Sequence, residues 1–123
     1  MATPPRLPVI HAETPIEELP LPELGGTWRQ PSNDAPLRIF RQGKRVFFTG
    51  ELLPGTSPSQ NIFKTPLPEG WRPDGNYWFP VYSAGAHIMF KIDKDGNLTH
   101  SYRANGGSYD WYPMNSVQYL AEN

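Results

Sequence analysis

The sequence predicts an all-β protein, an antiparallel β-sandwich or barrel of about seven short strands, preceded by an extended proline-rich N-terminal arm. Three observations predict this fold. The 123 residues include 15 prolines and 11 glycines, residue types that end helices or weaken their interiors. Short apolar runs recur roughly every ten residues with turn-forming residues between them, which is typical of antiparallel folds. A chain of 123 residues without cysteine suits one domain stabilised by packing or by association.

The first 26 residues differ in composition from the rest of the chain. They contain no aromatic residue, and prolines stand at positions 4, 5, 8, 15, 20 and 22. This density of prolines predicts an extended, polyproline-like arm over 1–26, with one short helical turn over 16–19 after Pro15. The head domain is then expected over 27–123.

Aliphatic side chains recur along this arm, and a solvated linker has no need of them. The arm is therefore interpreted either as a free tail or as an anchor that docks on a partner, and we favour the anchor. The residues expected to dock are Leu7, Val9, Ile10, Ile16, Leu19, Leu21 and Leu24.

The head domain contains seven segments with strand patterns. The clearest covers 86–92, where Ala86, Ile88, Phe90 and Ile92 share one face. Pro80 predicts an edge strand over 78–82, because proline cannot donate to a sheet ladder. Residues 54–60 are expected to form a loop, since turn-forming residues crowd them. The remaining expected strands cover 37–41, 45–52, 61–64, 98–102 and 117–120, the first two forming a hairpin that turns at Gly43.

Charge and motif content argue against several functions. The chain has 11 basic and 12 acidic residues, so it lacks the basic excess of a nucleic-acid-binding protein. No apolar run is long enough to insert in a membrane, and the N-terminus lacks the pattern of a signal peptide. No nucleophile elbow or phosphate-binding loop is present. We therefore expect no enzyme, no catalytic residue and no cofactor.

Two features superficially resemble metal sites. Asp93-Lys94-Asp95-Gly96-Asn97 shares acidic spacing with a calcium loop, but its glycine stands at position 4 instead of 6, so we interpret it as a hairpin turn. Similar distances from this turn are expected to bring His87 and His100 opposite each other. We interpret the pair as ordinary sheet-surface histidines and predict no metal site.

Two clusters of aromatic residues are the best candidates for binding. Flat rings next to amides and carboxylates suit sugars, because sugar C–H faces stack on rings while polar groups bind hydroxyls. The same residue types also build sandwich cores and subunit interfaces, and the sequence leaves all three readings open. The candidate residues are Tyr77, Trp78, Asn105, Tyr109, Asp110, Trp111 and Tyr112.

The order of short motifs resembles a known family. The segment 43–50 is followed by Leu67-Pro68-Glu69-Gly70-Trp71-Arg72-Pro73, then by an Ile-x-Phe-x-Ile strand, Asp95-Gly96-Asn97-Leu98 and the late Trp111. This order is similar to that of the C-terminal head domain of bacteriophage tail-fibre and minor structural proteins, over about residues 27–120. The most specific part is the 67–73 segment.

The resemblance implies a trimeric β-sandwich carried on the exterior of a virion, where some heads bind host-surface saccharide or protein and others are structural only. This chain has neither heptads nor a Gly-x-y shaft, and its arm favours an accessory attached directly to a capsid or tail protein through residues 1–26. A homotrimer would also bury surplus apolar residues on both faces of the strands. The alternatives are a tail-tip receptor-binding protein and a stand-alone carbohydrate-binding module.

Overall fold

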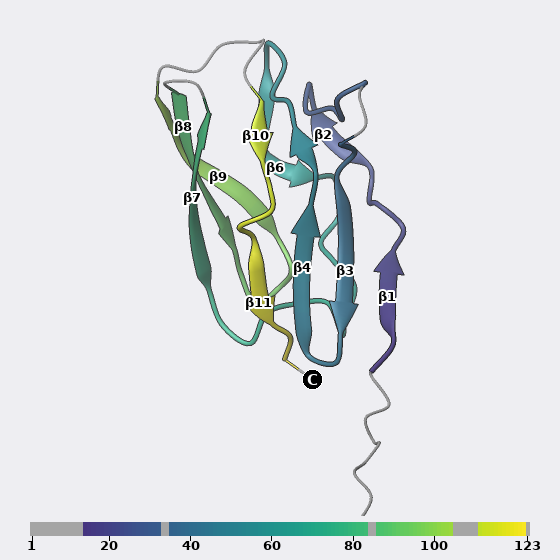
Figure 1. Ribbon diagram of the computed structural model, residues 1–123. Coiled ribbons are helices and arrows are strands. Elements are labelled where there is room, and N and C mark those ends of the chain that lie inside the picture. The colour runs from purple at the N-terminus through teal and green to yellow at the C-terminus, as the bar shows by residue number, and fades with distance from the viewer. Residues whose placement is uncertain (1–13, 33–34, 84–85, 105–110, 123) are drawn as a thin grey trace, which may run out of the picture.

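The computed structural model describes residues 14–32, 35–83, 86–104 and 111–122 (Figure 1). Within these ranges the protein is all-β, with eleven strands and no helix. Every strand pairing is antiparallel. The prediction of an antiparallel β-sandwich is thus confirmed.

One layer is a four-stranded sheet. Its hairpin turns at Gly43, where φ is 61°, so the predicted glycine turn is confirmed. The strands, in spatial order, are β1 (Ile16–Leu19), β3 (Arg38–Gln42), β4 (Arg45–Thr49) and β11 (Gln118–Leu120).

The other layer is a five-stranded sheet in which β7 forms one edge, as Pro80 predicts. A two-stranded pair, β5 (Glu51–Leu52) with β10 (Tyr112–Pro113), forms a separate small sheet. The strands of the larger sheet, in spatial order, are β2 (Leu24–Gly26), β6 (Pro58–Phe63), β9 (Leu98–Ala104), β8 (Ala86–Ile92) and β7 (Tyr77–Ser83).

The core forms from the inward half of each alternating strand. On β8, Ile88, Phe90 and Ile92 are fully buried, and on β4 Val46 and Phe48 are at most 1% exposed. The alternation predicted over 86–92 is confirmed, because Ile88, Phe90 and Ile92 share the inward face of β8. Residues from the loops complete the core, notably Leu37, Leu67 and Met114.

The N-terminal part of the described chain belongs to the sandwich. Residues 16–19 form strand β1 and pair with β3, so the predicted helical turn there is wrong. Residues 24–26 form β2 and pair with β6 in the opposite layer. The local proline content correctly indicated an extended backbone. Whether this backbone pairs with other strands depends on the sheet edges of β3 and β6 beside it. The described structure therefore has no break at residue 26.

Two strand boundaries also differ from the sequence expectation. The predicted loop over 54–60 is wrong at its end, because Pro58 already begins β6. The predicted strand over 45–52 is divided at Gly50, which has φ 90°. A Cβ at Gly50 would lie 1.9 Å from the carbonyl oxygen of Pro36, so only glycine allows this close approach.

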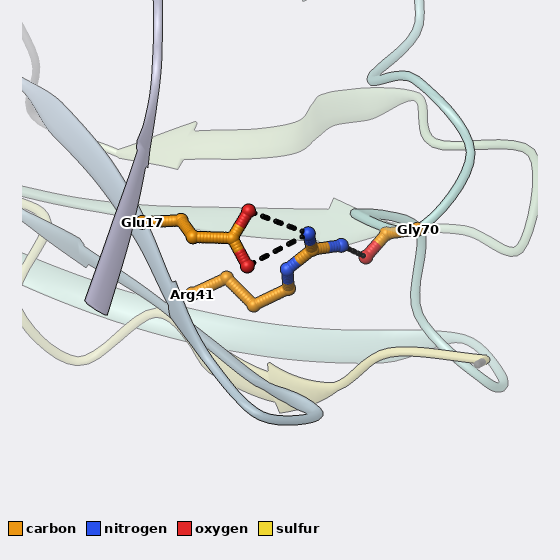
Figure 2. A network of polar contacts seen from close by, with 3 residues as sticks. All are labelled: Glu17, Arg41 and Gly70. Atoms are coloured by element: carbon orange, nitrogen blue, oxygen red, sulfur yellow. Dashed lines mark hydrogen bonds and ion pairs between the residues drawn. The ribbon is translucent and has the colours of Figure 1, made fainter. Parts of the chain in front are cut away.

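A single arginine ties the N-terminal strand to the loop that precedes β7. Figure 2 shows Arg41 reaching from β3 to the carbonyl oxygen of Gly70, to which its Nη1 donates at 2.6 Å, and to the Glu17 carboxylate on β1. The Nη2–Oε2 distance of the Glu17 ion pair is 3.0 Å. The guanidinium also lies 4.6 Å from the ring centre of Trp71.

The 67–73 segment closes one end of the sandwich. Leu67 donates its N–H to the Gly96 carbonyl at 2.9 Å, and Arg72 Nε donates to the Leu67 carbonyl at 2.7 Å. The Tyr119 hydroxyl donates to the Trp71 carbonyl at 2.6 Å. The motif that carries the family resemblance thus has a structural role, because it joins the β8–β9 turn to β11.

Candidate binding surfaces

The most exposed aromatic residues of the described chain lie on β7. Trp78 is 54% exposed and Tyr82 is 67% exposed, with exposed Pro80 between them. Phe79 and Val81 alternate with them and are buried. Because side chains alternate along a strand, Trp78, Pro80 and Tyr82 share the outer face of the five-stranded sheet.

Strand β8 contributes two polar side chains and a methionine to this face. Lys91, Met89 and His87 stand opposite Trp78, Pro80 and Tyr82 in the register. The Lys91 ammonium lies 5.1 Å from the Trp78 ring centre, and the His87 ring lies 5.7 Å from the Tyr82 ring. We call this surface the aromatic strip; it consists of Trp78, Pro80, Tyr82, His87, Met89 and Lys91.

The aromatic strip has the chemistry of a shallow binding platform. Trp78 and Tyr82 offer ring faces for stacking, while the Lys91 ammonium donates hydrogen bonds. The two rings are four residues apart on one strand, which corresponds to roughly 13 Å at about 3.3 Å per residue. That separation exceeds one sugar ring, so an oligosaccharide rather than a monosaccharide would contact both.

A second exposed tryptophan lines a hollow. Trp111 is 43% exposed and borders a hollow of about 430 Å³ together with Pro31, Ser32, Glu51 and Leu53. The hollow combines a ring with a carboxylate, as a polar ligand subsite requires. Trp111 was expected from the sequence, whereas nothing in the local pattern brings Glu51 to it.

The other predicted aromatic residues have different positions. Tyr112 is fully buried, with its ring edge-on to Phe90 at 6.3 Å, so its expected place on a binding surface is wrong. Tyr77 packs against the core and against Tyr119 at 5.9 Å, and its hydroxyl donates to Asp74 at 2.6 Å. That hydrogen bond raises the pKa of Tyr77. Asn105, Tyr109 and Asp110 lie outside the described residues.

The predicted docking residues of the arm divide into three groups. Leu19, Leu21 and Leu24 pack against the core of their own chain, so these side chains are not free to anchor a partner. Ile16 points outward and is 58% exposed. Leu7, Val9 and Ile10 lie outside the described residues. The sequence could not separate these groups, because aliphatic spacing alone does not show which side chains meet a sheet.

The predicted pairing of the two histidines is wrong. The β8–β9 hairpin closes with Ile92 opposite Leu98, which places His100 opposite Phe90 and His87 opposite Ala104. The His100 ring meets the buried Trp28 ring at 5.5 Å, on the core side of the sheet. Across the described residues no group of three or more potential metal ligands is found.

The acidic loop of this hairpin is a turn, as predicted. Asp93 Oδ1 accepts the backbone N–H groups of Asp95 and Asn97, each at 3.0 Å. The carboxylate therefore caps its own turn, as short acidic side chains commonly do.

On the outer face of the four-stranded sheet, arginine side chains cover two phenylalanine rings. The Phe40 and Phe47 rings stack at 5.5 Å, with Arg38 and Arg45 lying over them at 4.8 and 4.7 Å. Arginine stems and guanidinium groups thereby shield the apolar residues that alternate outward. The apolar surplus of β4, which favoured trimerisation in the sequence, is partly covered within one chain.

Comparison with models of protein families, with curated proteins and with solved structures found no match. Within the part of the chain that the structure describes, no helix could span a membrane. The function is therefore inferred from the surfaces themselves and from the motif order in the sequence.

Proposed function

We propose that the protein is a non-catalytic structural accessory of a bacteriophage particle, displayed on the virion exterior, whose β-sandwich adheres to saccharides of the host surface. The motif order over residues 27–120 supports the virion role. The aromatic strip on β7 and β8 supports adhesion, and it is the observation that carries the proposal.

The chemistry of the strip favours a saccharide over a protein partner. Within the described residues 21 hydrophobic side chains are buried, yet Trp78 and Tyr82 remain more than half exposed, so the core does not use these two rings. The strip lies on an open strand rather than in a deep pocket, which suits an extended chain of sugars. Lys91 and His87 border the rings and supply hydrogen-bonding groups.

Attachment to the particle is assigned to the residues before β1. Leu19, Leu21 and Leu24 are used within the sandwich, so the anchor shortens from residues 1–26 to the first 13 residues, which include Leu7, Val9 and Ile10. Three arms on a homotrimer would strengthen weak docking through effective concentration.

Adhesion is tested with the full-length chain on a broad array of bacterial surface glycans. Trp78→Ala should lower affinity for a bound glycan at least tenfold, which corresponds to about 1.4 kcal/mol of lost stacking. Ile16→Ser on the opposite sheet is the control, since the exposed fraction of Ile16, 58%, is close to the 54% of Trp78. Equal affinity of Trp78→Ala and the control would remove the strip from the proposal.

Attachment is tested by co-sedimentation with phage particles that lack the protein. The chain from residue 14 onward keeps every described strand and should fold, yet it should not sediment with the particles. Retained sedimentation would show that the first 13 residues are not the anchor.

A stand-alone carbohydrate-binding module is the second candidate. The arginine-covered outer face of β3 and β4 favours it, because this coverage lessens the need for a trimer. Glycan binding by a monomer that has no affinity for particles would support this candidate over the virion accessory.

A further inference from the structure

An apolar groove lies at the free edge of β11. It has a volume of about 300 Å³ and is lined by Arg45, Tyr77, Gln118, Tyr119 and Leu120. The Tyr77 and Tyr119 rings form its wall, with their centres 5.9 Å apart. Aromatic walls of this kind accept polyproline segments, because the preformed polyproline II conformation costs little entropy on binding.

The groove stands at one end of a single row of outward side chains. The register places Ile16 opposite Gln42, Gln42 opposite Arg45 and Arg45 opposite Leu120. Ile16 and Leu120, at the two ends of this row, are 58% and 53% exposed. They are the only exposed large aliphatic residues of the described chain, and one extended segment crossing the row would cover both.

The chain that precedes β1 starts from the other end of this row. Thr14 lies next to Gln42, whose Nε2 donates to the Thr14 carbonyl at 2.9 Å. The row spans three strand spacings of about 4.8 Å, or roughly 14 Å. Six residues of polyproline II, at about 3.1 Å each, cover roughly 19 Å. Pro8 stands six residues before Thr14, so the segment Pro5–Pro8 that it ends can reach the groove.

The sequence of this preceding segment matches the groove. Pro5-Arg6-Leu7-Pro8 has the P-x-x-P spacing of polyproline ligands, and Val9 and Ile10 follow it. The exposed Asp74 carboxylate, which accepts the Tyr77 hydroxyl at 2.6 Å, lies beside the groove. No basic residue in the described part of the chain forms an ion pair with Asp74, so it can pair with Arg6.

We propose that residues 1–13 fold back across the row from Ile16 to Leu120 and place Pro5–Pro8 in the groove of their own chain. Folding back on the same chain is favoured over a second copy, because a short tether that can reach the site gives a high effective concentration. On a particle, the anchor proposed above would leave this groove for its binding site there. The fold-back concerns the free chain and does not depend on that anchor.

A paramagnetic label tests the proposal directly. The chain has no cysteine, so Thr3→Cys creates one labelling site on full-length protein. The label should broaden the NMR signals of Leu120 and Tyr77 strongly and affect that of Tyr82, five residues further along β7, much less. A label at Thr14→Cys is the positive control, because it must broaden Gln42 wherever residues 1–13 lie.

Two further samples show whether residues 1–13 of the same chain or of a second copy fill the groove. The first is a mixture of labelled unenriched chain and unlabelled ¹⁵N-enriched chain, in which the Leu120 signal should stay sharp. Broadening of this signal would place a second copy in the groove and overturn the proposal. Absence of broadening at Leu120 in the singly labelled chain would overturn it as well.

Leu120→Ser is the second sample. Leu120 is 53% exposed and therefore tolerates change, and the variant should reduce the broadening at Tyr77 at least twofold. Unchanged broadening in this variant would argue against the groove as the site.

Discussion

Arg41 and Arg38 stand on the same strand, and both pair with a glutamate of β1, yet their surroundings differ. The Arg38 and Glu18 side chains are 50% and 43% exposed, whereas Arg41 is 20% exposed and also binds the Gly70 carbonyl and the Trp71 ring. Solvent screens the first pair, and three contacts converge on the second arginine.

We predict that Arg41→Gln lowers the free energy of unfolding by about 1–3 kcal/mol, because it leaves the Gly70 carbonyl without its charged donor. Arg38→Gln is the matched control and should change the urea midpoint little. Both midpoints follow from urea denaturation monitored by tryptophan fluorescence. Equal effects of the two variants would contradict the special position of Arg41.

The buried phenol of Tyr119 makes the stability of the protein depend on pH. Burial raises the pKa of Tyr119 above its ordinary value of 10.0. The unfolded chain therefore ionises this phenol first, so its contribution to stability is present below about pH 10 and is lost as the pH rises above that value.

We predict that the urea midpoint of the protein falls as the pH increases above 10. Tyr119→Phe should flatten this decline, while costing about 1 kcal/mol at neutral pH through the lost hydrogen bond to the Trp71 carbonyl. Tyr82→Phe, at an exposed ring, is the control. An alkaline decline of the same slope in Tyr119→Phe and in the unaltered protein would contradict the assignment.

At the scale of elements, β1 is the least buried strand of its sheet. Ile16, Glu17 and Glu18 are exposed, and only Leu19 packs against the core. Strand β4 of the same sheet lies between β3 and β11 and buries Val46 and Phe48. Side-chain attachment of β1 therefore depends largely on the ion pairs to Arg38 and Arg41.

We predict that amide hydrogen exchange in β1 accelerates severalfold between 0.05 and 0.5 M salt, while exchange in β4 stays constant, because salt screens exposed ion pairs. Glu17→Gln with Glu18→Gln should give fast exchange in β1 at low salt. The same protection of β1 at both salt concentrations would show that backbone pairing alone holds this strand.

At the scale of the whole molecule, the outcome of truncation depends on where the sandwich begins. Both layers use residues of the first 26, since β1 lies in one sheet and β2 in the other. Removing residues 1–13 should leave the circular dichroism spectrum and the urea midpoint nearly unchanged. Removing residues 1–26 takes away two strands and three core-contacting leucines and should prevent folding.

The oligomeric state follows from the proposed virion role. We predict a mass near three times 13.9 kDa for the full-length chain by light scattering. A mass near 13.9 kDa would favour the stand-alone carbohydrate-binding module. Trp78→Ala tests adhesion independently, because the aromatic strip lies on one chain.

The class of fold and most of the strands can be predicted from the amino-acid sequence alone. Alternation placed Ile88, Phe90 and Ile92 on one face of β8, Pro80 indicated an edge strand, and glycine indicated the β3–β4 turn. These features are local: a strand repeats every two residues, and proline and glycine act on their own backbone. Aromatic clustering also named Trp78 and Trp111 as candidates but left open whether they lie in the core, at an interface or on a binding surface.

Which distant segments pair is visible only in the folded molecule, so the next outcomes come from the three-dimensional structure. The fold shows several such pairings. It placed residues 16–19 beside β3, buried Tyr112, separated His87 from His100, and brought Lys91 to Trp78. Each outcome depends on which distant segments pair and in which register. A shift of the register by one residue would move every side chain of a strand to the other face of the sheet. Such choices minimise the free energy of the whole sandwich, so no short stretch of sequence contains them.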